Sequence, residues 1–232
     1  MSGNSPFVYS GHENLLAMQR AVNYNRFLAA EIEKNATSRR IVVDFGAGVG
    51  ALAGETRRWS ERLICIETDN SQREILRSQS LEALADMSQL ADESVDYVYC
   101  VNVLEHIEDD AGTVRDFHRK IRRGGRLFIY VPAMQFLYSA MDRAVGHHRR
   151  YYRAALASMI QSAGFRIERS DYVDSLGVAA TLAYKWLGDK QGRINLRALR
   201  LYDRYVFPLS RAFDVLARKI AGKNLLLVGE KP

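Results

Sequence analysis

The first residues suited to chemistry lie in the stretch IVVDFGAGVGALAG, residues 41–54, and are an acid and the first three of its four glycines. An apolar run ends at Asp44, and Gly46, Gly48 and Gly50 lead into a segment of helical character. Glycines in such a loop let the backbone approach a ligand closely, and a helix N-terminus offers free N–H groups. The stretch predicts a cofactor site. Because GAGVGA also satisfies the dinucleotide fingerprint, the glycines leave the cofactor open.

Asp44 favours a cationic cofactor. This acid lies at the expected carboxyl edge of a sheet, where open α/β folds bind their ligands. A carboxylate there repels a pyrophosphate and attracts the ammonium and sulfonium groups of S-adenosylmethionine (SAM). Glu67, at the end of the next apolar run, can accept hydrogen bonds from ribose hydroxyls in either type of cofactor. The alternative role for Asp44 is an N-cap of the following helix.

Two later segments carry candidates for proton transfer. His106 lies in VLEHIED, and His147 lies in DRAVGHHRRYYR, each beyond an apolar run. A hydroxyl or a protonated amine that reacts as a nucleophile is helped by a nearby base, so these two histidines are the candidate catalytic residues. The alternative for His106 is packing at the mouth of the site.

The second segment also carries candidate contacts to the acceptor, namely His148, Arg149, Arg150 and Tyr151. Arginines make bidentate hydrogen bonds to anions, so the segment would suit an acceptor with a carboxylate or a phosphate. The alternative is pairing inside the protein with Asp142, Glu105 or Glu108.

The elements that must position these residues alternate between short apolar runs and helical patterns from residue 40 to 174. Such alternation is typical of a parallel sheet covered by helices. Strands are predicted at 39–45, 62–67, 81–86, 95–101, 126–133 and 165–173, with a seventh at 224–231. Helices are predicted at 49–59, 70–79, 109–123 and 153–164. The expected fold class is α/β, a Rossmann-like, seven-stranded, mostly parallel sheet with helices on both faces.

The length of 232 residues suits one domain, residues 1–232, in which two helical segments flank the core. Residues 1–39 are expected to form an N-terminal helical lid over the cofactor, with Tyr9, His12 and Tyr24 as contacts. Residues 40–174 form the predicted cofactor-binding core. Residues 175–223 form a basic helical insertion that Pro208 breaks or bends, and residues 224–232 form the last strand.

The composition is that of an ordinary globular protein, with a hydrophobic fraction of 47% and a charged fraction of 26%. No apolar run reaches the ~20 residues of a transmembrane helix, and the first residues lack the features of a secretory signal. A cytoplasmic location is therefore expected. Cys65 and Cys100 fall in predicted strands as core thiols, and no Cys/His cluster has zinc-ligand spacing, so no metal site is predicted.

The net charge of +6 is concentrated near the C-terminus. From Lys185 onward there are eleven bases and four acids, which gives +7 there and about −1 over the rest of the chain. A basic helical segment that also carries aromatic residues suits a peripheral contact with an anionic membrane, or with nucleic acid. The alternatives are a solvated helix face and the interface of a homodimer.

Four stretches together resemble the successive motifs of the class I SAM-dependent methyltransferases: VVDFGAGVG, CIETD, DMSQLADESVDYVYCVNVLEHIED and IRRGGRLFIYVPA. Their order and spacing cover roughly residues 40–135. Beyond them, YVPAMQFLYSAMDRAVGHHRRYYRAALASMIQSAGF and GKNLLLVGEKP resemble a bacterial group of these enzymes with a GHxRRY element after the fifth strand. Arg123 departs from the family pattern, which usually has proline before the paired glycines.

The resemblance implies a role for each matching residue. The methionine end of SAM would contact two sets of residues: Asp44, Phe45, Gly46, Ala47 and Gly48, and then Asn102, Val103 and Leu104. Glu67 would bind the ribose, and Thr68 would lie beside the adenine. Asp86 with Met87 would meet the adenine edge, and Asp92 is the competing acid for that role.

The function expected from the resemblance is methyl transfer from SAM to a small-molecule acceptor that is acidic, glycosidic or lipid-linked. The cofactor supplies the leaving group, so the protein mainly aligns the partners and excludes water, and no metal is required. The alternatives are a nicotinamide-dependent oxidoreductase and a non-catalytic SAM-binding scaffold. Nucleic-acid methylation is disfavoured because the chain lacks an Asn/Asp-Pro-Pro-aromatic signature. Whether oxygen, nitrogen or carbon is methylated stays open.

Overall fold

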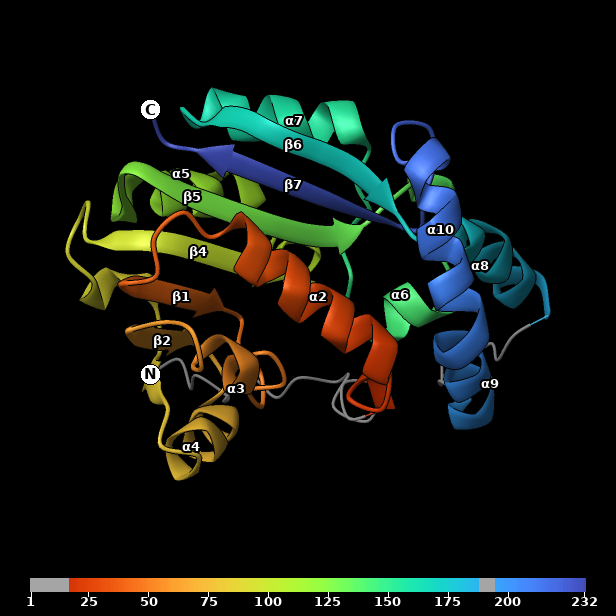
Figure 1. Ribbon diagram of the computed structural model, residues 1–232, viewed down its shortest axis with the longest axis horizontal. Coiled ribbons are helices and arrows are strands. Elements are labelled where there is room, and N and C mark those ends of the chain that lie inside the picture. Colours follow the sequence, from red (N-terminus) through yellow and green to blue (C-terminus); the bar gives the residue numbers. More distant parts are fainter. Residues whose placement is uncertain (1–16, 188–194) are drawn as a thin grey trace, which may run out of the picture.

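Seven strands form one sheet among the residues that the structure, a computed structural model, describes, 17–187 and 195–232 (Figure 1). The sheet order is β3-β2-β1-β4-β5-β7-β6. The strands are β1 Ile41–Phe45, β2 Arg62–Ile66, β3 Glu82–Leu84, β4 Val95–Val101, β5 Ile121–Pro132, β6 Arg166–Val173 and β7 Asn224–Glu230. Strands β1 to β5 run parallel, and β7 runs antiparallel between β5 and β6. The predicted seven-stranded, mostly parallel sheet is confirmed.

The sheet separates two hydrophobic cores, because successive side chains of a strand face opposite sides. On one face, Val43 and Val98 pack with helices α5 (Asp110–Lys120) and α7 (Arg153–Ser162). On the other face, Val42 and Leu63 pack with α2 (Val22–Asn35), α3 (Ala53–Thr56) and α4 (Asn70–Ser78). Both faces are covered, which is why the central strands read as nearly continuous apolar runs.

Two predicted helices have different boundaries in the structure. The helix expected at 49–59 is reduced to α3, since the chain before it still turns at Gly50, where φ is +85°. The helix expected at 109–123 ends at Lys120. Ile121 takes an extended conformation and pairs with Val95, so three residues with helical periodicity belong to β5 instead. Strand pairing therefore overrides the local pattern at this boundary.

The predicted basic insertion forms three helices in its described part, α8 (Leu176–Leu187), α9 (Leu196–Leu201) and α10 (Phe207–Ala217). A π-helical turn, η4 (Tyr202–Val206), joins α9 to α10. The chain stays helical through Pro208, which lies in the first turn of α10. The expected break does not occur at this proline, and the helix is irregular just before it, at the π turn.

Two buried carboxylates hold these helices against the rest of the molecule. Asp203 of η4 accepts hydrogen bonds from the backbone N–H groups of Asn23 and Tyr24, at 3.0 and 2.9 Å, and so caps the first turn of α2. Asp214 of α10 accepts two backbone N–H groups just before α8, at 2.9 and 2.8 Å. Helix N-termini leave such donors without partners inside the helix. The two acids therefore join segments that lie far apart in the sequence.

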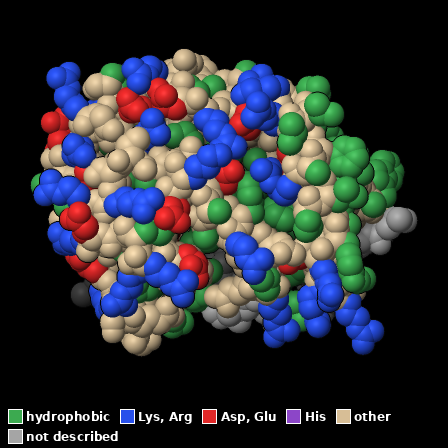
Figure 2. Space-filling view, viewed as in Figure 1, with side chains coloured by type: hydrophobic (Ala, Val, Ile, Leu, Met, Phe, Trp, Pro, Cys, Tyr) green, Lys and Arg blue, Asp and Glu red, His purple; other side chains and the backbone are tan. Residues whose placement is uncertain are grey.

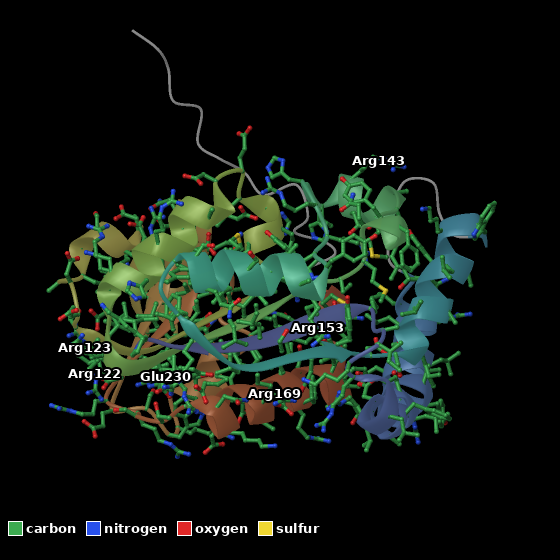
Figure 3. The ribbon with its side chains drawn as sticks, turned by 90° about the horizontal axis from the view of Figure 1, so that it is seen from above. Arg122, Arg123, Arg143, Arg153, Arg169 and Glu230 are labelled. Atoms are coloured by element: carbon green, nitrogen blue, oxygen red, sulfur yellow. The ribbon has the colours of Figure 1, made fainter. Side chains whose placement is uncertain are left out.

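Helix α2 is also tied to the outer strand β6. Arg169 of β6 points toward α2, where it pairs with Glu31, and its guanidinium also donates to Asp171 at 2.7 Å (Figure 3). Helix α2 is thus fixed near both of its ends, by Asp203 and by Arg169. None of the helices within residues 17–187 and 195–232 is long and apolar enough to cross a membrane.

We expect Asp203→Ala to lower the free energy of unfolding by about 1–2 kcal/mol, since two N–H groups at the start of α2 lose their acceptor and α2 has no side-chain cap of its own. Urea denaturation measures this change. Asp116→Ala is the control, because Asp116 forms an exposed pair with Arg119, and exposed pairs contribute little to stability. Equal losses in the two variants would contradict the capping role.

Candidate active site

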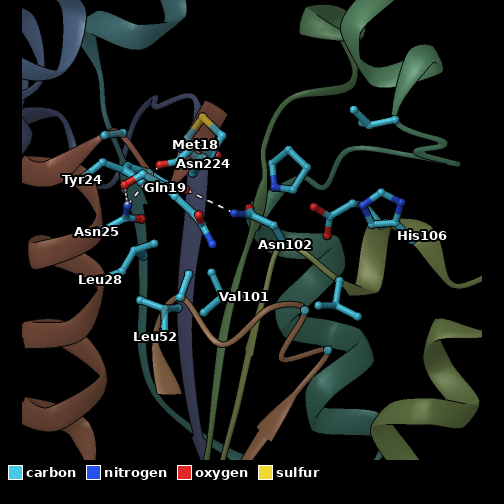
Figure 4. Close-up of a pocket in the computed structure, with 18 of the residues that line it drawn as sticks. Met18, Gln19, Tyr24, Asn25, Leu28, Leu52, Val101, Asn102, His106 and Asn224 are labelled. Atoms are coloured by element: carbon cyan, nitrogen blue, oxygen red, sulfur yellow. Dashed lines mark hydrogen bonds between the residues drawn. The ribbon is translucent and has the colours of Figure 1, made fainter. Parts of the chain in front are cut away.

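A cavity of about 470 Å³ opens at the carboxyl end of the parallel strands (Figure 4). Its walls come from the loops after β1, β2 and β4, from α2 and the residues before it, and from the short helix α6 (Ala140–Ala144). The C-terminal helices close one side with Leu199, Tyr202 and Phe207. A cavity of this size is typical of a site for a small ligand or cofactor.

The glycine loop after β1 lies directly against the loop after β4. Gly46 has a φ of +77°, and a side-chain carbon added to it would lie 2.3 Å from a methyl carbon of Val103. Only glycine fits there, because the backbone is left-handed and there is no room for a side chain. Asn102, which precedes Val103, donates from its side-chain amide to the Tyr24 hydroxyl at 3.2 Å (Figure 4). The two loops and α2 therefore meet at one place in the cavity wall.

Asp44 is buried in the cavity wall at the end of β1, with 4% of its surface exposed. Its backbone lies beside Cys65 of β2 and Tyr99 of β4 in the parallel register. Burial, together with the carboxylate of Glu67, raises the pKa of Asp44 to about 7. A cation bound in the cavity would favour the ionised form and lower that pKa again. The position is therefore suited to a positively charged ligand.

Glu67 connects the loops after β1 and β2. One of its carboxylate oxygens accepts the N–H of Gly48 at 2.9 Å, and the other accepts the N–H of Asp69 at 2.9 Å. The side chain is buried at the cavity wall, and the neighbouring Thr68 is exposed. The acid is thus fixed where two loops converge. Hydroxyl groups of a ligand can donate to its carboxylate in place of these two backbone N–H groups.

Glu105, His106 and His147 form a second group of ionisable side chains in the cavity wall, called here the Glu105–His147 cluster. The turn η2 (Leu104–His106) carries the first two, and His147 follows α6. The two imidazole rings lie edge to face with centroids 4.6 Å apart, and His147 Nε2 lies 3.7 Å from Glu105 Oε1. These residues come from segments about forty positions apart and meet only through the fold.

Burial dominates the electrostatics of this cluster. Glu105 is fully buried, and neither of its carboxylate oxygens has a hydrogen-bond partner within the described part of the chain. Burial raises the pKa of Glu105 to about 8 and, with the neighbouring His147, lowers the pKa of His106 to about 4. The protein therefore holds a carboxyl group and an imidazole in contact with the cavity, both biased toward their neutral forms.

Asp142 orients His147. One oxygen of its buried carboxylate lies 2.8 Å from His147 Nδ1, and Arg150 holds both oxygens in a bidentate pair at 2.8 and 3.0 Å. Burial alone would raise the pKa of Asp142, but the hydrogen bonds from His147 and Arg150 outweigh it and hold this pKa well below its usual value. An ionised Asp142 accepts from Nδ1–H, which leaves His147 Nε2 on the side of Glu105.

Most of the residues singled out by the sequence line the cavity: Asp44, Phe45, Gly46, Ala47, Gly48, Glu67, Thr68, Asn102, Val103, His106, His147 and Arg150. The fold brings the predicted cofactor residues and both candidate bases to the same cavity. The predicted contacts Tyr9 and His12 lie outside the described residues, whereas Tyr24 lines the cavity. The individual roles of these residues stay predictions.

Six predicted site residues lie away from the cavity wall. Met87 and Leu104 are buried in the core, and His148 is exposed. Asp86 is exposed and accepts the N–H of Ser88 at 2.7 Å, and the competing Asp92 pairs with Lys120. The remaining two are Arg149, whose guanidinium pairs with Asp110 at 3.0 Å, and Tyr151, whose hydroxyl donates to the same carboxylate at 2.7 Å.

Pairing inside the protein, the alternative considered for the arginines, is what the structure contains. Arg150 pairs with Asp142, and Arg149 pairs with Asp110 and donates to the carbonyl of Glu108 at 3.0 Å. The guanidinium of Arg150 is therefore already neutralised where it lines the cavity.

Lys223 is a cavity residue that the sequence analysis did not single out. It precedes β7, and its N–H donates to the carbonyl of Asp174 at 3.0 Å. Burial lowers the pKa of Lys223, although Asp174 opposes this shift. If the last strand is taken to be antiparallel, it must begin at the edge where the parallel strands end. The residue before it then lies on the ligand side of the sheet, and this reasoning could have found Lys223.

Comparison with known proteins decides the family. A family model described as a methyltransferase domain matches residues 18–170, about two thirds of the chain and most of the cavity wall. The chain belongs to this family. It is a class I SAM-dependent methyltransferase, and its cofactor is SAM. The buried Asp44 fits the charge of this cofactor, and the glycine loop fits its need for close backbone contact. The match to a methyltransferase domain disfavours the nicotinamide-dependent oxidoreductase.

Among curated relatives, the methyltransferase is 24% identical over 150 residues to a ubiquinone biosynthesis O-methyltransferase of Xanthomonas euvesicatoria. The match covers 55% of this chain and 63% of that protein. An S-adenosylmethionine-dependent methyltransferase of Mycolicibacterium smegmatis is 29% identical over 147 residues, which cover 60% of this chain and 55% of the relative. The chain thus spans less than two thirds of the length of these relatives.

Solved structures share the fold of the methyltransferase. A chain of the Haloferax volcanii complex between the Trm112 methyltransferase activator and a methyltransferase matches with a TM-score of 0.68 at 17% identity, over 97% of this chain and 94% of that one. The geranyl diphosphate C-methyltransferase of Streptomyces coelicolor A3(2) matches with a TM-score of 0.62 at 12% identity, over 89% and 78% of the two chains. At these identities the likeness concerns the fold alone.

We expect Asp44→Asn to weaken SAM binding about 10- to 100-fold at pH 8, because the cation loses a charged partner. The same change should raise the melting temperature of the ligand-free methyltransferase by roughly 2–4 °C at pH 8, because it removes a buried charge. Calorimetric titration and thermal denaturation measure the two effects. Asp116→Asn, on the surface, should change neither. A variant that loses stability and affinity together would indicate a merely structural role for Asp44.

The wild-type protein should bind SAM more weakly as the pH falls below about 7, since Asp44 must lose its proton to meet the cation. The stability of the ligand-free protein should show the opposite trend. The folded-state pKa of Asp44 lies above its unfolded value, so its contribution is present at low pH and is lost as the pH rises through about 7. Parallel titrations of the wild type and of Asp44→Asn between pH 6 and 8 isolate this group. Identical pH profiles for the two proteins would contradict the assignment.

Proposed function

We propose that the methyltransferase transfers a methyl group from SAM to a hydroxyl oxygen of a small, largely apolar acceptor. The acceptor would lie between the Glu105–His147 cluster and the C-terminal helices. The observation that carries this proposal is that a carboxyl group without a hydrogen-bond partner among the described residues, and two imidazoles, share one cavity with the glycine loop and Asp44. A hydroxyl nucleophile loses its proton when it is methylated. Ionisable side chains beside the methyl donor can assist that loss.

For the cofactor we keep the roles that the sequence predicted. Asp44, the glycine loop and Asn102 would enclose the methionine end, and Glu67 would exchange its backbone partners for the ribose hydroxyls. We also keep the proposed division of the domain into a lid (1–39), a core (40–174), an insertion (175–223) and a last strand (224–232). Helix α2 and the residues before it would form part of the lid. The contacts of Met18, Gln19 and Tyr24 with the cavity support this role for the N-terminal segment.

SAM supplies the methyl group and the neutral thioether that leaves. The protein would hold the acceptor oxygen in line with the carbon–sulfur bond, and the Glu105–His147 cluster would stabilise the acceptor as its O–H bond breaks. The acceptor oxygen then bonds to the methyl carbon while the carbon–sulfur bond breaks, and one proton is released. Asp142 would keep His147 in a single orientation through this step. Alignment and exclusion of water account for most of the rate gain in such a displacement.

The acceptor half of the cavity suits an apolar molecule with an acidic group. Its apolar wall includes Met141 and Val145 from α6 and its end, together with Leu199 and Phe207 from the C-terminal helices. Two basic residues, Arg150 and Lys223, line the cavity. Arg150 is paired with Asp142, so Lys223 would be the one that binds the acidic group of the acceptor. The relative named as a ubiquinone biosynthesis O-methyltransferase supports both a small-molecule acceptor and methylation of oxygen.

We also propose that the chain belongs to the bacterial group with a GHxRRY element, here Gly146 to Tyr151. The contacts of this segment support the proposal, because several of its residues bind buried acids at or near the cavity. His147 and Arg150 both bind Asp142, and Tyr151 donates to Asp110 beside the cluster. A segment with such connections positions the acceptor side of the cavity.

We expect the protein to methylate alkyl-substituted phenols and catechols and to leave the matching anilines unmodified, in assays with SAM labelled on its methyl group. Glu105→Gln and His147→Ala should each reduce this transfer at least about 100-fold, in the range typical of groups that assist proton transfer. Glu108→Gln is the matched control, since Glu108 is exposed and lies outside the cavity wall. Transfer to the anilines alone would overturn the choice of oxygen.

A second proposal concerns the exposed face of the C-terminal helices, which we infer contacts an anionic membrane surface. Large apolar side chains gather at the end of the molecule formed by α8 and α10, with Lys and Arg beside them (Figure 2). From α9 through α10 and just beyond, one exposed stripe repeats every three or four residues: Leu201, Tyr205, Leu209, Phe213, Leu216 and Ile220. The buried face of the same helices carries Asp203, Phe207 and Asp214.

The charges beside this stripe favour a membrane over a second copy of the chain. Exposed bases flank it at both ends, including Arg197, Arg200 and Arg204 on one side and Arg218 and Lys219 on the other. Two copies brought together through such a face would place these bases near one another, whereas anionic headgroups attract them. An amphipathic helix of this kind lies in the plane of the interface. The face would also give a lipid-linked acceptor a short route to the cavity, whose wall includes Leu199.

We expect the protein to sediment with vesicles of phosphatidylglycerol and phosphatidylcholine and to release at high salt. The double change Phe213→Glu and Leu216→Glu should reduce binding at least about tenfold, because each apolar side chain contributes on the order of 1–2 kcal/mol when buried. Ile75→Glu, an exposed apolar position on α4, is the control. Methylation of a water-soluble phenol should be equal in all three proteins. A stable dimer that binds no vesicles would favour the homodimer instead.

A further inference from the structure

We propose that Glu105, His106 and His147 bind a divalent transition-metal ion, of the zinc type, in the wall of the cavity. One ligand atom from each residue lies within 4.8 Å of the other two. The inference deepens the proposed function, because it states how the Glu105–His147 cluster would activate the acceptor hydroxyl. It rests on that function only for the role of the ion, and not for its binding.

The first support is the condition of Glu105. Its carboxyl group is fully buried, and both oxygens lack a hydrogen-bond partner among the described residues. A buried carboxyl group without partners is costly, so such groups in proteins nearly always bind a donor or an ion. Glu105 is nevertheless one of the residues that line the cavity.

The second support is that the imidazole of His147 is held by a carboxylate on the side away from Glu105. Asp142 binds Nδ1 of His147 at 2.8 Å and is itself fixed by Arg150 and by the Ser139 N–H. Metal-binding histidines almost always donate their second ring N–H to a carboxylate or a backbone carbonyl, which fixes the ring and aims the other nitrogen at the ion. The carboxylate–histidine arrangement of Asp142 and His147 has this form.

The third support is the geometry of the donor set. Zinc lies about 2.0–2.2 Å from imidazole nitrogen and carboxylate oxygen. At that bond length, the 3.7 Å between His147 Nε2 and Glu105 Oε1 corresponds to an angle at the ion of roughly 120°, close to tetrahedral. A small movement of the His106 ring completes the set, since its ligand atom already lies within 4.8 Å of the other two. Two histidines and one carboxylate are a donor set of catalytic zinc sites, which keep an open position for water or substrate.

The open position would face the cavity, because all three residues line it. An acceptor hydroxyl bound there would have its acidity increased by the ion, as a metal-bound water does. Its proton would pass to solvent water, and the ion would stabilise the oxygen anion until it attacks the methyl carbon. The carbon–sulfur bond then breaks, which leaves a neutral thioether and a methyl ether. Neither oxidant nor reductant is needed.

The experiment is a metal titration of the full chain after dialysis against a chelator. We expect one Zn²⁺ per chain by calorimetry, and one Co²⁺ that gives visible absorption bands of a four- or five-coordinate ion. Glu105→Gln and His147→Ala should abolish both signals. Asp142→Asn, which removes the charge behind His147, should weaken binding about 10- to 100-fold. Glu108→Gln is the matched control and should bind like the wild type, since its side chain lies outside the cavity.

Two outcomes would overturn the metal site. One is absence of stoichiometric binding to the wild-type protein, whose folding is checked by thermal denaturation. The other is equal binding to wild type, Glu105→Gln and His147→Ala, which would place the ion elsewhere on the surface. Binding of S-adenosylhomocysteine and phenol methylation by the chelated protein are measured alongside. If both persist without metal, the proposed role of the ion in catalysis fails while the proposed function stands. If the protein binds Zn²⁺ but methylates none of the phenols or catechols, the metal site stands and the proposed function fails.

Discussion

The structure depends on negative charge that is buried at one edge of the sheet and that the described residues do not balance with positive charge. Asp44 lies near the end of β1, where the charged neighbour that shifts its pKa among the described residues is another acid, Glu67. Burial makes ionisation of Asp44 costly in the ligand-free protein. A cofactor with a sulfonium and an ammonium group reverses this cost. In the predicted role of Asp44, a bound cationic ligand would balance this charge, which would be a physical basis for selectivity toward SAM.

Other buried acids show that burial alone does not identify a functional group. Asp203 and Asp214 are about as deeply buried as Asp44, yet each accepts two backbone N–H groups near the start of a helix, so they stabilise the docking of the insertion. Asp142 is likewise saturated by its donors and acts as a fixed anionic support for an imidazole. Glu105 is equally buried but has no such donors in the described part of the chain, so burial biases its carboxyl group toward the neutral form.

Much of the fold was determined by the sequence itself. The apolar runs of β1, β2 and β4 mark buried parallel strands because both faces of the sheet need apolar side chains, and Gly46 marks a turn that admits no side chain. The acid after β1 was enough to favour a cationic cofactor. Local patterns failed where pairing between distant strands decides the conformation, as at Ile121, which has helical spacing and lies in β5.

Only the tertiary structure decided which distant residues meet. Glu105 and His147 lie about forty positions apart, so no ligand spacing in the sequence could reveal a cluster that α6 brings together. Lys223 reaches the cavity because β7 runs antiparallel, a direction that its residues do not encode. Whether a buried acid has hydrogen-bond donors also depends on residues far away in the sequence. Asp203, for example, accepts the N–H of Asn23 in α2. Local conformation and residue chemistry follow from the sequence, whereas long-range packing determines which charges remain unbalanced.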